Sequence, residues 1–138
     1  MLTFFAETKT ERMTQTLTPE IAATLEIAVR AADSTGAKKP VAVEVTEQLG
    51  LADVFLIVSG EVERSVLAIA REIEDAVNAS GVKTIRREGR ELGRWVLLDF
   101  GDLIVHVFHE EERDFYQLER LWGDCPIIDV GEWITDSE

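Results

Sequence analysis

Cysteine is almost absent from this chain, since Cys125 is the only one in 138 residues. One thiol cannot close a disulfide within the chain, and it cannot supply the several thiolates of a cysteine-rich zinc site. Chains that lack disulfides are typical of reducing compartments. We therefore expect a cytoplasmic protein.

Long apolar runs are absent as well. The apolar stretch over residues 2–6 has no basic start and is too short for a signal peptide, and no later stretch approaches the ~20 apolar residues of a membrane span. Residues 1–18 mix polar residues without an apolar period, which is typical of a flexible leader. At 138 residues with 46% hydrophobic residues, the chain is expected to form one soluble domain.

Basic residues are scarce, because 14 Lys and Arg stand against 27 Asp and Glu, for a net charge of −13. A field of this sign repels phosphate backbones and anionic lipids, so we expect neither direct nucleic-acid binding nor membrane binding. The acidity has two interpretations: it keeps the protein in solution, or it suits docking onto a basic macromolecule. Composition alone does not separate them.

The apolar pattern alternates between strand and helix periods, and it predicts an α/β domain with a mixed sheet flanked by helices over residues 19–122. One helix is expected to follow the N-cap Thr18 and to end near Gly36. A second is expected to open at Ser59 and Gly60. The predicted strands cover residues 41–45, 53–58, 83–88, 95–100 and 103–109, and a further helix or pair of turns covers residues 110–122.

Residues 95–109 are interpreted as a β-hairpin around a two-residue turn at Phe100 and Gly101, which places Trp95 opposite His106. The aliphatic face of this hairpin is expected to meet the helices. The aromatic face is either a set of interface anchors or a second core layer with a satisfied histidine. The aliphatic face holds Val96, Leu98, Leu103 and Val105, and the aromatic face holds Trp95, Leu97, Ile104, His106 and Phe108.

Several fragments suggest catalysis, but none is complete. Residues 99–101 spell the metal-binding tripeptide of kinases without the other kinase motifs. The run that begins at His109 has Arg113 where a zinc protease has its second histidine. Glu61 and Glu63 are a candidate carboxylate pair for two-metal nucleotidyl transfer, although acids at a helix start need no such role. We expect no catalytic residue, no cofactor and no metal site.

The second half of the chain carries a more specific pattern, which consists of Trp95–Asp99, Gly101, Asp102, Val105–Phe108, Arg113, Phe115, Tyr116, Leu118, Glu119, Leu121 and Trp122. This pattern resembles the ribosomal silencing factor family, RsfS, also called Iojap. The resemblance begins in the first predicted helix and ends at Trp122. The leader of residues 1–18 and the acidic tail of residues 123–138, whose order is left open, fall outside it.

The resemblance implies an α/β domain that is related to nucleotidyltransferases, has lost their catalytic residues and forms a homodimer. It also implies binding to the large-subunit ribosomal protein numbered fourteen, on the face where the small subunit joins, so that subunit association is blocked when nutrients are scarce. Two alternatives are kept, a residual nucleotidyltransferase and a factor for large-subunit assembly.

Carried over residue by residue, the resemblance implies two groups of partner-binding residues. For Leu118 and Trp122, a role in the fold or in the dimer stays open. The contact residues are Trp95, His106, Tyr116, Leu118, Glu119 and Trp122, and their polar supports are Glu88, Asp99 and Arg113.

Overall fold

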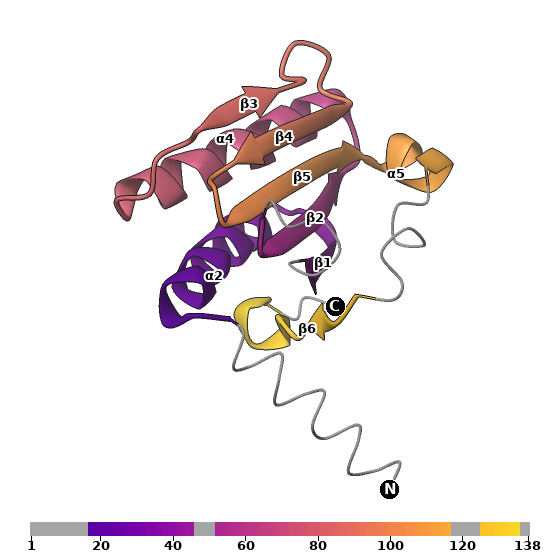
Figure 1. Ribbon diagram of the computed structural model, residues 1–138. Helices are drawn as coiled ribbons and strands as arrows, with labels where there is room; N and C mark the ends of the chain where they lie inside the picture. The colour runs from indigo at the N-terminus through magenta and orange to yellow at the C-terminus, as the bar shows by residue number, and fades with distance from the viewer. Residues whose placement is uncertain (1–16, 46–51, 117–124, 136–138) are drawn as a thin grey trace, which may run out of the picture.

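The structure is a computed structural model that describes residues 17–45, 52–116 and 125–135, with the backbone alone at 114–116. Figure 1 shows α4 behind strands β3 and β4 of the sheet. The elements are α2 (Pro19–Ser34), β1 (Lys38–Glu44), β2 (Val54–Gly60), α4 (Glu63–Ala79), β3 (Arg86–Glu88), β4 (Trp95–Asp99), β5 (Leu103–His109), α5 (Glu110–Tyr116), β6 (Ile127–Ile128) and the 3₁₀ turn η1 (Gly131–Trp133).

The sheet of the described residues has six strands in the order β3-β4-β5-β2-β1-β6. Strands β2 and β5 run parallel at its centre, and the other neighbours are antiparallel. All seven residues of β2 are buried, as expected of the continuous apolar run. The predicted α/β class with a mixed sheet is therefore confirmed. None of the helices in the described ranges is both long enough and apolar enough to cross a bilayer.

The first helix begins as predicted. The Thr18 hydroxyl accepts a hydrogen bond from the backbone N–H of Ile21 at 3.1 Å, and Pro19 occupies the first turn, where its missing N–H costs nothing. The second helix begins later than predicted, at Glu63, because Ser59 and Gly60 complete β2 and pair with β5. A Cβ on Gly60 would lie 3.0 Å from the backbone nitrogen of Val66, so glycine lets α4 fold back closely over the strand.

The register of the hairpin differs from the prediction by two residues. Asp99 pairs with Ile104 and the backbone N–H of Phe100 donates to the carbonyl of Leu103 at 2.9 Å, so Gly101 and Asp102 form the tip of the turn, and Trp95 lies opposite Phe108 rather than His106. The turn is displaced by one residue because Phe100 is only 6% exposed and packs into the core, whereas a turn at Phe100 and Gly101 would hold this side chain at the tip. A shift of two keeps every side chain on its face. The aliphatic face does meet α2 and α4, as expected.

Other boundaries also move. Strand β1 starts earlier than predicted, at Lys38, and β3 is confined to residues 86–88 of the predicted 83–88. Strand β6 pairs with β1, and Val130 beyond it is buried, so part of the segment set apart as an acidic tail is ordered against the domain. Helix α5 covers the start of the predicted 110–122 segment, and residues 117–122 lie outside the described residues.

Candidate partner-binding surface

The Trp95 face is the side of the sheet opposite α2 and α4. It combines residues with very different exposure: Ile57 and Phe108 are completely buried, whereas Trp95 is 37% exposed. This face is therefore a second core layer beneath an aromatic residue that reaches solvent. We define the Trp95 face by Phe55 and Ile57 of β2, Trp95 and Leu97 of β4, and Ile104, His106 and Phe108 of β5.

Trp95 is held in place by two neighbours on β5. Its indole Nε1 donates a hydrogen bond to Nδ1 of His106 at 3.2 Å, and its ring centroid lies 4.7 Å from that of Phe108. The contact with His106 is diagonal across the hairpin, which cross-strand neighbours on one face permit. A large side chain that is fixed in this way loses little further freedom when a partner covers it.

His106 supports Trp95 from below. It is 5% exposed, and its ring lies 4.8 Å from the ring of Phe55. Burial lowers the pKa of His106 to about 4, so the imidazole is neutral near pH 7 and its Nδ1 can accept the hydrogen bond from the indole N–H. The histidine is thus a buried positioning residue of this surface.

This burial predicts a pH dependence of stability. Because the folded-state pKa of about 4 lies below the ordinary 6.5, the unfolded chain takes up the proton first as the pH falls. The contribution of the neutral, buried His106 to the free energy of unfolding is fully present above pH 6.5 and is lost between pH 6.5 and about 4. At pH 5 the loss should be about 2 kcal/mol. Urea unfolding above pH 6.5 and at pH 5 measures this loss of stability. The His106→Asn protein keeps a hydrogen-bond acceptor but does not titrate, so between the same two pH values it should lose about 2 kcal/mol less than the wild type. Equal losses in both proteins would refute the assignment.

A pocket of about 290 Å³ lies beside Trp95 and is lined by Glu88, Gly89, Trp95 and Leu97. The exposed carboxylate of Glu88 borders it, and Arg86 lies 3.5 Å from that carboxylate. Gly89 has a φ of +85°, and a Cβ there would lie 2.0 Å from the carbonyl oxygen of Trp95. The loop after β3 can therefore approach Trp95 this closely only with glycine.

Two of the expected polar supports are engaged inside the fold. One carboxylate oxygen of Asp99 accepts a hydrogen bond from the backbone N–H of Gly101 at 2.9 Å and so closes the hairpin turn. Arg113 is 4% exposed and donates to the hydroxyl of Ser59 at 2.7 Å, which ties α5 to the end of β2. By strand alternation, Asp99, which pairs with Ile104, and Ser59, which Arg113 contacts, both lie on the side of the sheet that carries the Trp95 face.

The structure thus brings Trp95, His106 and Glu88 together, on β4, β5 and β3. Tyr116 ends α5, and its side chain is not among the described parts of the structure. Three further expected contact residues, Leu118, Glu119 and Trp122, lie outside the described residues.

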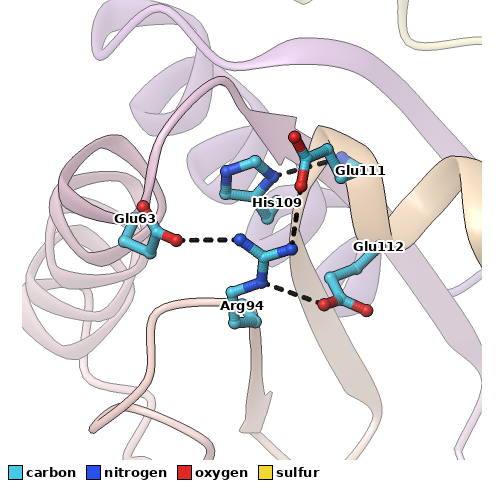
Figure 2. A network of polar contacts seen from close by, with 5 residues as sticks. All are labelled: Glu63, Arg94, His109, Glu111 and Glu112. Atoms are coloured by element: carbon cyan, nitrogen blue, oxygen red, sulfur yellow. Dashed lines mark hydrogen bonds and ion pairs between the residues drawn. The ribbon is translucent and has the colours of Figure 1, made fainter.

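A charged network at the end of the sheet was not foreseen from the sequence (Figure 2). Arg94, just before β4, donates to Glu63 at 2.8 Å, to Glu111 at 3.1 Å and to Glu112 at 2.9 Å. These three carboxylates raise the pKa of Arg94. The network joins the start of α4 to the start of α5, and the acidic run after His109 was the only sequence signal for it.

The network also includes Glu63, one of the two glutamates considered above as a catalytic carboxylate pair. A hydrogen bond from its own backbone and another from Arg94 lower the pKa of Glu63, whose carboxylate points at the guanidinium in Figure 2. Glu61 lies 3.6 Å from Lys38 instead. In the described ranges, no three His, Cys, Asp or Glu side chains converge in a way that could hold a metal ion. Both glutamates are engaged with cations of the fold.

Comparison with known proteins decides the family. Residues 18–138 match the family model described as ribosomal silencing factor during starvation. The chain belongs to this family. A ribosomal silencing factor RsfS from Bacillus subtilis is 44% identical over 106 residues, which are 77% of this chain and 90% of that protein. The matched range also includes residues 123–138, beyond the pattern that ended at Trp122.

Two solved structures are similar over most of the chain. A protein from Bacillus halodurans is 42% identical, with a TM-score of 0.68 over 76% of this chain and 95% of that one. A protein from Chromobacterium violaceum is 31% identical, with a TM-score of 0.73 over 75% of this chain and 86% of that one. The resemblance inferred from the residues is therefore confirmed, and membership in the RsfS or Iojap family makes the chain a non-enzymatic factor of translation regulation.

Proposed function

We propose that this chain binds the large ribosomal subunit through its ribosomal protein fourteen and blocks joining of the small subunit, which represses translation when nutrients are scarce. The observation that supports this most is Trp95, an exposed aromatic residue that His106 and Phe108 hold rigidly on one face of the sheet. Rigid aromatic residues at the centre of a surface are the usual anchors of protein interfaces.

In this proposal Trp95 is the central contact and Glu88 lies at its edge, where an exposed carboxylate suits a basic partner. His106 acts through Trp95, while Asp99 and Arg113 act by holding the hairpin turn and α5. Four further contact residues complete the proposed surface: Tyr116, Leu118, Glu119 and Trp122.

The proposed mechanism is steric. A protein that occupies the joining face of one subunit prevents the other from docking, and no bond need be made or broken. The relation of the fold to nucleotidyltransferases, without their catalytic residues, is also part of the proposal. Glu61 and Glu63 near the start of α4 are engaged by Lys38 and Arg94, which is consistent with the loss of those residues. We also propose that the chain forms a homodimer when it is off the ribosome.

Binding can be tested in two steps. The full chain should co-sediment with isolated large subunits, and it should bind purified ribosomal protein fourteen in calorimetry. The small subunit serves as the control and should not retain the chain. Retention on large subunits together with no binding to the purified protein would place the contact elsewhere, and no retention at all would overturn the proposal.

A further inference from the structure

A groove of about 680 Å³ crosses the outer side of α4. Its walls come from Thr35, beyond the end of α2, and from Arg90 in the loop between β3 and β4. Arg64 and Arg71 rise from α4 beside it, and the small side chain of Ala68 lies between them in the sequence. Seven residues along an α-helix span about 10 Å, so two guanidinium groups stand along one open channel.

The charge of this groove is opposite to that of the whole chain. Three arginines line it against two glutamates, Glu72 and Glu91, whereas the chain has 14 basic and 27 acidic residues. Chance placement on so acidic a protein would favour the reverse. The groove therefore stands out as a local basic surface.

The arginines of the groove are also available to a ligand. Arg64 and Arg71 are exposed and make no ion pair with the residues that the structure describes. Arg90 lies 3.8 Å from Glu74, but Arg87 is the stronger partner of that carboxylate through two hydrogen bonds. By contrast, Arg94 is surrounded by three carboxylates. Guanidinium groups left without a carboxylate partner are suited to binding an external anion.

The groove is adjacent to the proposed protein-binding surface. Gly89 lines the pocket beside Trp95, and the next residue, Arg90, lines the groove. Helix α4 packs on the face of the sheet opposite Trp95, so one partner can contact Trp95 while a second group occupies the groove. The two surfaces meet at the loop between β3 and β4.

We propose that this groove binds the phosphate backbone of ribosomal RNA next to the ribosomal protein that Trp95 contacts. The inference rests on the proposed function, which brings the chain to a particle whose surface is rich in phosphate. The fork of an arginine side chain matches phosphate oxygens and forms short charge-assisted hydrogen bonds with them. Because the net charge of −13 repels free RNA, the contact forms only once the protein contact holds the chain in place.

The test compares two double variants that remove the same charge. The double variant Arg64→Gln with Arg71→Gln removes the two guanidinium groups of the groove that make no ion pair within the described residues. Lys39→Gln with Lys83→Gln is the matched control, because both lysines are exposed and neither makes an ion pair within the described residues or lines the groove. The affinity of each protein for isolated large subunits is measured over a series of salt concentrations, and a second titration uses purified ribosomal protein fourteen.

The arginine variant should bind large subunits about tenfold more weakly at low salt, and the slope of log affinity against log salt should fall by about 2. The lysine variant should keep the wild-type slope, and both variants should bind the purified protein as the wild type does. Equal melting temperatures would establish that the variants are folded.

Two results would overturn the proposal. Identical behaviour of the arginine and lysine variants on large subunits would remove the groove as a contact. An equal loss of affinity for the purified ribosomal protein would assign the groove to a protein partner rather than to RNA. If the wild type fails to bind the purified protein, the proposed function fails separately, because the salt dependence on whole subunits still reports on the groove.

Discussion

Trp95→Ala should weaken binding to ribosomal protein fourteen by about 2 kcal/mol or more, a loss of about thirtyfold in affinity. The substitution removes the exposed indole at the centre of the proposed contact, together with its hydrogen bond to His106 and its packing on Phe108. Titration calorimetry with the purified partner measures the effect. Because Trp95 is 37% exposed, the core beneath it should keep the variant folded.

The matched control is Ile127→Ala, which also shortens an exposed apolar side chain. Ile127 is 64% exposed and lies on β6, at the opposite edge of the sheet from β3 and β4. The Ile127→Ala protein should bind ribosomal protein fourteen as the wild type does. Unchanged binding by a folded Trp95→Ala protein would remove Trp95 from the contact, and unfolding detected by circular dichroism would assign it to the core instead.

Gly89→Ala should destabilise the protein by about 3 kcal/mol or more. Alanine at a φ of +85° costs about 1 to 2 kcal/mol, and its Cβ would lie 2.0 Å from the carbonyl oxygen of Trp95, so the loop must also move. This displacement should weaken partner binding as well, because it shifts the backbone that carries the indole. Urea unfolding at neutral pH measures the loss of stability.

Gly81→Ala separates the two causes. Gly81 has a φ of +104°, but a Cβ there would meet no atom within 4 Å, so only the backbone strain of about 1 to 2 kcal/mol is expected. The Gly81→Ala protein should bind ribosomal protein fourteen as the wild type does. Equal destabilisation by the two substitutions would contradict the close approach of the loop to Trp95.

The sequence was most informative where local chemistry decides the structure. The hydroxyl of Thr18 and the ring of Pro19 define a helix start without any distant partner. The two faces of the hairpin were also predictable, although the predicted register was wrong. A shift of two residues preserves the alternation that places Trp95 and Val96 on opposite faces. The exposed anchor and the aliphatic core face follow from that alternation alone.

Contacts between distant segments were not predictable. Arg94 meets Glu63 and Glu112, which are 31 and 18 residues away in the chain, and no local pattern indicates such a pairing. Arg113 donates to Ser59, 54 residues before it, and no local pattern indicates this contact either. The pairing of β6 with β1 was missed for the same reason, since a two-residue strand has no period of its own.

Subunit joining tests the central claim most directly. Isolated large and small subunits are mixed after the large subunits have been incubated with saturating protein, and light scattering follows the formation of the joined ribosome. We predict that the wild type slows joining strongly, that Ile127→Ala does the same, and that Trp95→Ala restores most of the rate. A joining rate that is unchanged by saturating wild-type protein would contradict the proposal that this chain silences ribosomes by blocking the joining face.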